Sequence, residues 1–291
     1  MFGRRPDGVA IDGNMDPITR VGNYIMTERI DAQVFAKQMI DAEVINRFIA
    51  EQRLQGHNLS HMAVIIAAYV RMVSQMPEAN RFVVNKRIYA RNEICVSFTT
   101  VKNRTRDNFE ETVLKVKFDP HDTVIQVGEK IDAAIDEYRN AESDEGSIVL
   151  SFAKFLMKVP GLPSFGVGLL KLLDRYGLMP KSLIDISPFH TSMFLTNVAS
   201  LKMSDVFHHI YNFGTTSQFF SIGKREQHLQ LDWQGNEQQR SYFPMGITLD
   251  ERPCAGALLA QAMREFMRNL NHPELMLTPP KAVVTEGTNK N

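Results

Sequence analysis

Hydrophobic positions along the first third of the chain switch between the spacing of strands and that of helices. Residues 35–49 form an extended run followed by an amphipathic helix, and residues 60–76 form a strongly apolar helix with Ser60 as its N-cap. Two short extended runs then flank Asn85-Lys86, a pattern typical of a tight hairpin. This part of the chain therefore predicts helices that pack on strands.

The rest of the chain continues the same alternation. Strands are predicted at 94–101, 111–118, 192–198, 219–223 and 245–249, and helices at 122–138 and 255–270. Interleaved strands and helices predict an α/β fold, a two-layer sandwich of a mixed β-sheet and helices. We expect a single domain over residues 20–277, with flexible tails at 1–19 and 278–291.

Residues 148–173 are the most apolar segment of the sequence. Its lysines, Lys154, Lys158 and Lys171, and its prolines interrupt the ~20 apolar residues that a membrane-spanning helix requires. We therefore predict two short helices and no transmembrane segment. Two roles stay open: packing against the sheet or a neighbouring subunit, and contact with a protein or lipid partner.

Charge and cysteine content narrow the function classes. Lysine plus arginine equals aspartate plus glutamate at 33 each, so no net field attracts nucleic acid, and we expect no nucleic-acid partner. Cys95 and Cys254 stand far apart without the paired spacing of metal ligands, which predicts reduced thiols and no metal site. The first sixteen residues lack the apolar run of a secretory signal, so the expected location is the cytoplasm.

Three motifs occur in a fixed order: Pro77–Asn80 before paired strands, Met193–Asn197 before a later strand at 219–223, and Gly246–Ala257 before the last helix. Their order and spacing resemble the catalytic domain of the acyltransferase component of 2-oxo acid dehydrogenase complexes, which has a chloramphenicol-acetyltransferase-like fold. The chain also resembles a stand-alone bacterial group with an Asp-Glu-Arg loop and with segments like Pro188–His190 and His208–Gly214.

The resemblance implies a chemistry and an assembly. In the family a loop histidine deprotonates the thiol of coenzyme A or dihydrolipoamide, the thiolate attacks a thioester, and a hydroxyl stabilises the oxyanion. In the family that site lies between the subunits of a trimer, so the resemblance implies a homotrimer here. The family's trimers assemble further into a hollow cage, which is a second possible level of assembly for this chain. Coenzyme A is a candidate substrate. No lipoyl segment fits into residues 1–20, so no covalent lipoyl group is expected.

The sequence departs from the family at its functional positions. Glu251 stands where the family has the catalytic histidine, Ala255 replaces the loop aspartate, and Thr196 replaces the oxyanion-stabilising serine. Thr196 keeps a hydroxyl donor. A carboxylate with a pKa of about 4.3 is a poor base for a thiol with a pKa of about 8.5, unless burial raises the pKa of Glu251.

Several assignments stay open. In one hypothesis Glu251 is the general base and Thr196 is the oxyanion donor. In the other, Glu251 and Arg252 form a structural pair in an inactive site. The histidines His190, His208 and His209 are candidates to supply the missing imidazole, and Asn197 is a candidate to line the site. Cys254 is either a nucleophile or a buried structural thiol. The function hypotheses are accordingly a divergent coenzyme A-dependent acyltransferase and a non-catalytic scaffold of the same fold.

Overall fold

The structure is a computed structural model that describes residues 5–105, 108–140 and 161–286. Its centre is a mixed β-sheet with the strand order β2-β10-β8-β7-β5-β6, and β9 pairs with the first half of β10. The strands are β2 (Gln33–Asp41), β5 (Ile94–Thr105), β6 (Asn108–Phe118), β7 (Met193–Asn197), β8 (Gln218–Ile222), β9 (Glu226–Leu231) and β10 (Glu237–Asp250). β7 runs parallel to β5 and β8, and the other pairs are antiparallel.

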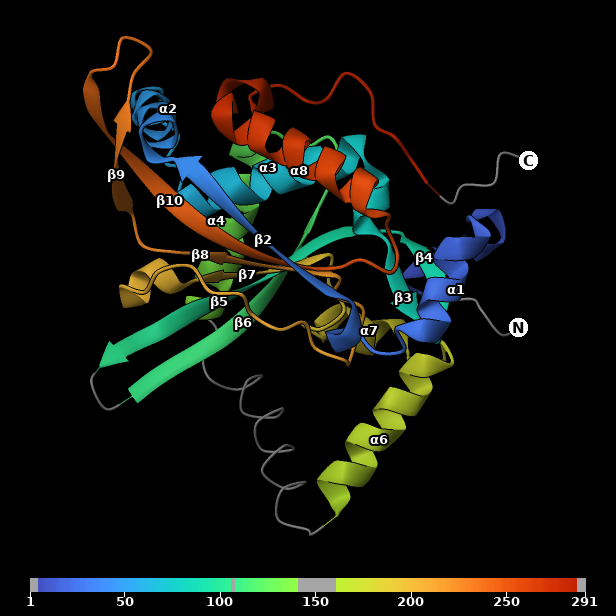
Figure 1. Cartoon of the computed structure of the whole chain (residues 1–291). Helices are drawn as coiled ribbons and strands as arrows, with labels where there is room; N and C mark the ends of the chain where they lie inside the picture. Colours follow the sequence, from blue (N-terminus) through green and yellow to red (C-terminus); the bar gives the residue numbers. More distant parts are fainter. Residues whose placement is uncertain (1–4, 106–107, 141–160, 287–291) are drawn as a thin grey trace.

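Helices cover one face of this sheet and complete the main core. They are α2 (Ala42–Leu54), α3 (His61–Gln75), α4 (Val124–Asn140) and α8 (Gly256–Asn271), and α3 packs against both α4 and α8 (Figure 1). Because α3 is apolar around nearly its whole circumference, it lies between the sheet and its neighbours, with Tyr69 edge-on to Phe220. This arrangement confirms the predicted α/β sandwich of mixed sheet and helices.

A second, three-stranded sheet has the order β1-β4-β3, with β1 (Gly8–Ala10), β3 (Phe82–Val84) and β4 (Arg87–Arg91). Asn85 and Lys86 take positive φ angles of 50° and 65°, as the predicted tight hairpin requires. The N-terminal residues differ from the expected tail, because β1 and α1 (Pro17–Ile25) are regular elements. Pairing of β1 with β4, which lies 79 to 83 residues later in the sequence, stabilises a segment whose own hydrophobic pattern does not predict a strand.

The C-terminal segment after η5 (Pro273–Met276) has no regular structure but lies against the domain. Arg71 donates to the backbone of Thr278, the amide of Val284 donates to Ser74 O at 2.9 Å, and Arg81 forms an ion pair with Glu286. Residues 278–286 are therefore fixed by polar contacts at both of their ends.

The apolar segment predicted at 148–173 is described only from residue 161 onwards. There it forms α6 (Leu162–Arg175), followed by α7 (Lys181–Ile186), on the opposite side of the sheet from α3 and α8 (Figure 1). The first of the two predicted short helices lies outside the described residues. Among the described helices, none is both long enough and apolar enough to cross a membrane.

Candidate functional site

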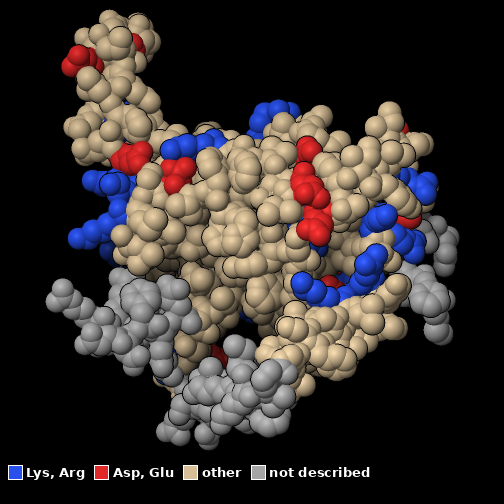
Figure 2. All heavy atoms as spheres, turned by 60° about the horizontal axis from the view of Figure 1, so that its bottom comes forward, with Lys and Arg blue, Asp and Glu red and all other residues tan. Residues whose placement is uncertain are grey.

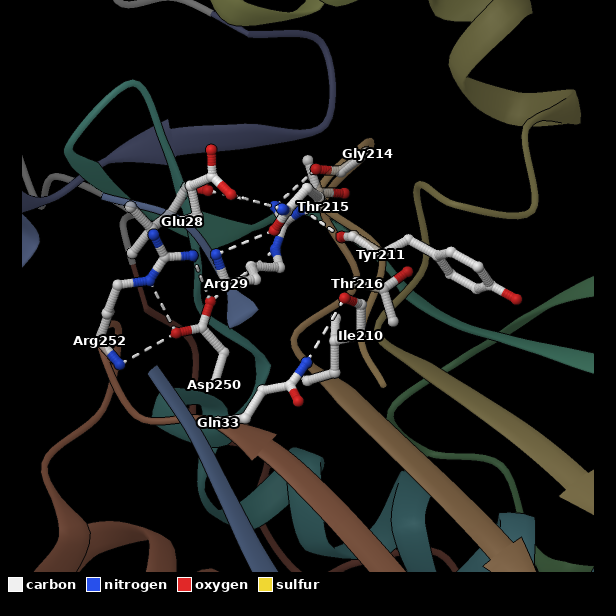
Figure 3. A network of polar contacts seen from close by, with 12 residues as sticks. Glu28, Arg29, Gln33, Ile210, Tyr211, Gly214, Thr215, Thr216, Asp250 and Arg252 are labelled. Carbon is white, nitrogen blue, oxygen red and sulfur yellow. Dashed lines mark hydrogen bonds and ion pairs between the residues drawn. The ribbon is translucent and has the colours of Figure 1, made fainter. Parts of the chain in front are cut away.

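The loop that follows β10 is held by a buried ion cluster around Asp250. Arg252 donates two hydrogen bonds to this carboxylate, from Nε to Oδ1 at 2.9 Å and from Nη2 to Oδ2 at 2.7 Å, and Arg29 Nε lies 3.8 Å from Oδ2 (Figure 3). All three side chains are almost completely buried. The carboxylate thus gives two buried guanidinium groups a shared partner of opposite charge, although its single charge offsets only one of theirs.

The two arginines connect this loop to distant segments. Arg29 donates to the carbonyls of Tyr211 and Gly214 (Figure 3). Arg252 donates to the carbonyls of Met26 and Thr27. Burial lowers the pKa of Arg29 to about 10, because the loss of water outweighs the nearby charge of Asp250. The loop after β10, the connection before β2 and the loop 210–216 are therefore joined through guanidinium groups.

Glu251 lies outside this cluster, so the suggested pair of Glu251 with Arg252 is wrong: the partner of Arg252 is Asp250. The Glu251 side chain is exposed and has no polar partner in the described part of the chain, and its amide donates to Ala32 O at 3.1 Å. Glu251 lines a mainly apolar groove of about 550 Å³ between β2 and α8. Ala255, also exposed, precedes the first turn of α8.

Thr196 lies in a different cavity, of about 610 Å³, at the C-terminal end of β7. The cavity is lined by Thr99, Thr112, Val113, Pro188, Phe194, Thr196, His208, Tyr211 and Phe219. The Thr196 side chain is half-buried, and its hydroxyl makes no hydrogen bond with any described residue. Asn197 follows it as an exposed residue. The cavity therefore combines the hydroxyl groups of three threonines and Tyr211 with the aromatic rings of Phe194, His208, Tyr211 and Phe219.

His208 is the histidine that the structure places in the cavity of Thr196. Its ring stacks on Phe219 with centroids 4.0 Å apart and on His209 with centroids 4.4 Å apart. Nδ1 lies 2.8 Å from the carbonyl oxygen of His209, and a ring nitrogen facing a carbonyl must carry the hydrogen. Nε2 then keeps its lone pair. Burial lowers the pKa of His208, which favours this neutral form.

His190 belongs to another cluster, which ties the N-terminal segment to α6. Its Nδ1 lies 2.8 Å from Ser187 Oγ and its Nε2 lies 3.2 Å from Asp174 Oδ1, and Asp174 also pairs with Arg5. Burial would raise the pKa of Asp174, but the hydrogen bond to His190 and the charge of Arg5 outweigh it and hold the pKa at about 2. His190 is completely buried, which indicates a structural role.

The remaining candidate residues have simpler environments. Cys254 is buried, and burial raises the pKa of its thiol to about 12, which favours the structural thiol over the nucleophile. His209 is exposed and stacks on His208. Within the described residues, no group of three or more His, Cys, Asp or Glu side chains has the arrangement of a metal site.

Strand register separates Glu251 from Thr196. Thr196 pairs with Ser221 of β8, and Ser221 pairs with Gly246 of β10. Glu251 stands five residues beyond Gly246, which is about 17 Å along an extended strand. Sequence reasoning therefore named residues of two separate surfaces. Sequence reasoning did not identify Tyr211 or Arg29 as site residues. The His-His-x-Tyr spacing could have indicated Tyr211, and the position of an arginine shortly before a predicted strand could have indicated Arg29.

Comparisons with known proteins address the fold. No protein-family model matches the sequence, and no curated protein matches it either. The structure is similar to a probable dihydrolipoamide acetyltransferase from Listeria monocytogenes, with a TM-score of 0.56 and 11% identity over 93% of this chain and 97% of that one. A dihydrolipoamide acetyltransferase from Azotobacter vinelandii gives 0.52 and 14% over 90% and 93% of the two chains.

Chloramphenicol acetyltransferase gives a TM-score of 0.51 and 12% identity, over 90% of this chain and 99% of that one. The chain thus has the fold of the acyltransferase cores, as the sequence motifs predicted. More particularly, the similarity to the two dihydrolipoamide acetyltransferases extends over at least 90% of this chain. At such identities the similarity concerns the fold alone.

Proposed function

We propose that the chain transfers an acyl group between a thioester and a thiol, with the reacting atoms in the cavity of Thr196. The observation that carries the proposal is the position of His208, which lines this cavity and presents Nε2 with its lone pair. A neutral imidazole is the usual general base near pH 7. His208 would therefore replace the family's loop histidine, and coenzyme A is the candidate thiol or thioester.

The reaction requires few protein groups. His208 Nε2 takes the proton of the attacking thiol, and the thiolate adds to the thioester carbonyl. The Thr196 hydroxyl donates a hydrogen bond to the oxyanion that forms. When the intermediate collapses, the carbon–sulfur bond of the original thioester breaks, and the departing thiolate receives the proton from His208. The aromatic wall around Phe219 keeps the imidazole oriented throughout.

We further propose that the site is completed between copies of the chain in a homotrimer. One chain carries the cavity of Thr196, and the groove of Glu251 lies about 17 Å away along the strands. β2, which lies beside that groove, is the edge of the central sheet and exposes Val34 by 40% and Phe35 by 53%. A second chain packed there would bring the two surfaces together.

Assembly is tested by the mass in solution, expected at three times the 33.1 kDa of one chain. One structural neighbour is the cubic core of a pyruvate dehydrogenase multienzyme complex, so a cage of several trimers would give a larger multiple. A mass of one chain at micromolar concentration contradicts the shared site. Phe35→Glu, at an exposed edge position, should lower the mass of the assembly without unfolding the chain.

Activity is tested by following thioester loss from acetyl-coenzyme A with dihydrolipoamide as acceptor. His208→Gln should reduce kcat at least about a hundredfold, as expected for loss of a general base. His209→Gln, the exposed neighbour, is the matched control and should retain activity. Thr196→Val should cost a similar factor, whereas Thr196→Ser keeps the hydroxyl and the rate. Equal activities of the two histidine variants would contradict the assignment.

One observation favours a second function, that of a non-catalytic scaffold. The position of the family's histidine holds Glu251, an exposed carboxylate without a polar partner in the described chain, and Ala255 supplies no second carboxylate. A protein or lipid partner would then use the exposed stripe of Phe165, Leu169 and Leu172 on α6. Calorimetry with coenzyme A and acetyl-coenzyme A separates the two functions, because a folded trimer that binds neither is a scaffold.

A further inference from the structure

A second open cleft, of about 580 Å³, lies apart from the cavity of Thr196. It is enclosed by α6, the β3–β4 hairpin, the connection before β2 and the loop 212–214. Its lining residues are Thr27, Glu28, Arg29, Val83, Val84, Asn85, Lys86, Lys171, Asp174, Arg175, Asn212, Phe213, Gly214 and Arg252. Figure 1 shows the C-terminal end of α6 beside this hairpin and α1. The volume is within the range of small-molecule sites.

Positive charge dominates the lining, with five cationic side chains against two carboxylates. The carboxylate of Asp174 is already paired with Arg5, and Glu28 accepts a hydrogen bond from Asn212 at 2.8 Å. Arg29 and Arg252 form the deep part of the cleft and share Asp250, which does not neutralise both of them. The cleft therefore keeps an excess of positive charge after its internal pairs are counted.

Three cations at the rim have no carboxylate partner among the described residues. They are Lys86 in the hairpin turn, and Lys171 and Arg175 one turn apart on α6. Lys86 Nζ lies 4.8 Å from the centre of the Tyr24 ring, and Arg175 Nε donates to Asn85 Oδ1 at 3.1 Å, so the terminal nitrogens of Arg175 remain available. Figure 2 shows how Lys, Arg, Asp and Glu side chains are distributed over one face of the molecule.

We propose that this cleft binds the phosphate groups of a small phosphorylated molecule. Arginine matches phosphate through two parallel N–H donors, and two lysines at the same rim add point charges. The apolar side chains of Val83, Val84 and Phe213 line the same cleft and would contact the organic part of such a ligand. The site does not depend on the proposed acyl transfer, because no residue of the Thr196 cavity lines it.

Binding of a ligand in the cleft would also affect the loop after β10. Arg29 and Arg252 line the cleft and hold Asp250, the residue before Glu251. A ligand anion near these guanidinium groups offsets part of their unbalanced charge, so binding should stabilise the native state. The expected sign is therefore a rise of Tm with ligand concentration.

The test is calorimetric titration of the whole chain with inorganic pyrophosphate, phosphate and adenosine monophosphate at constant ionic strength. The double variant Lys171→Gln/Arg175→Gln should weaken pyrophosphate binding about tenfold or more, since it removes two charge-assisted contacts. The double variant Lys224→Gln/Arg225→Gln changes the same charge at exposed positions outside the cleft and should bind as the wild type does.

If adenosine monophosphate binds more tightly than phosphate, the ligand is an organic phosphate. If only the Lys171→Gln/Arg175→Gln variant loses binding of all three probes, the result supports the cleft as the binding site. The proposal is overturned if none of the probes binds saturably, or if both double variants weaken binding equally, because the effect would then be one of net charge. Thermal unfolding of each variant without ligand verifies that the exposed substitutions leave the fold intact.

Discussion

The charge cluster around Asp250 leads to a quantitative prediction for Asp250→Asn. The substitution keeps the shape of the side chain but removes the charge that faces Arg29 and Arg252. Burial already lowers the pKa of Arg29 from its ordinary value to about 10 with Asp250 present, which corresponds to about 3 kcal/mol against its charged form. Without the carboxylate, two buried guanidinium groups face each other unpaired, and we expect a loss of about 3–5 kcal/mol in the free energy of unfolding.

Urea unfolding at pH 7, followed by circular dichroism, measures this loss. Glu251→Gln is the matched control, because it removes one carboxylate at the next position, where the side chain is exposed and unpaired within the described chain. That variant should stay within about 0.5 kcal/mol of the wild type. If Asp250→Asn unfolds within about 1 kcal/mol of Glu251→Gln, the cluster does not stabilise the loop, and the reasoning is refuted.

Three further predictions follow from buried groups. The pKa of Asp174 is about 2 in the folded chain, below its ordinary value of 3.8. The ionised carboxylate therefore contributes about 2 kcal/mol to the free energy of unfolding above pH ~4, and this contribution is lost as the pH falls towards 2. Asp174→Asn should flatten the dependence of the unfolding free energy on pH in that window. Cys254 should resist iodoacetamide at pH 8 until urea unfolds the chain. Gly214→Ala should lower Tm by several degrees in a thermal scan, because the new Cβ would lie 2.2 Å from Phe189 O.

Much of the fold could be predicted from the sequence because its signals are local. The apolar circumference of α3, the Asn85-Lys86 turn and the alternation along β6 each determine an element without reference to distant residues. The N-terminal segment could not be predicted in this way. Its strand depends on β4, and Arg5 depends on Asp174, 169 residues away.

The sequence could indicate which residues are candidates for the site, but not which of them lie together. Motif order identified Thr196, His208 and Glu251, but strand register decides which of them are neighbours. His190 and His208 are equally plausible bases in the sequence. In the structure His190 is buried beside the charged Asp174, whereas Nδ1 of His208 faces a backbone carbonyl. Both environments arise from tertiary packing, which the sequence does not reveal.

The position of Asp250 changes what can be altered in the loop after β10. The carboxylate that holds this loop is that of Asp250, directly before residue 251. Position 255 takes no part in the ion cluster and lies exposed at the start of α8. An aspartate could be introduced there, together with a histidine at 251, without dismantling the existing anchor. Positions 251 and 255 are therefore open to substitution while the buried carboxylate keeps the loop in place.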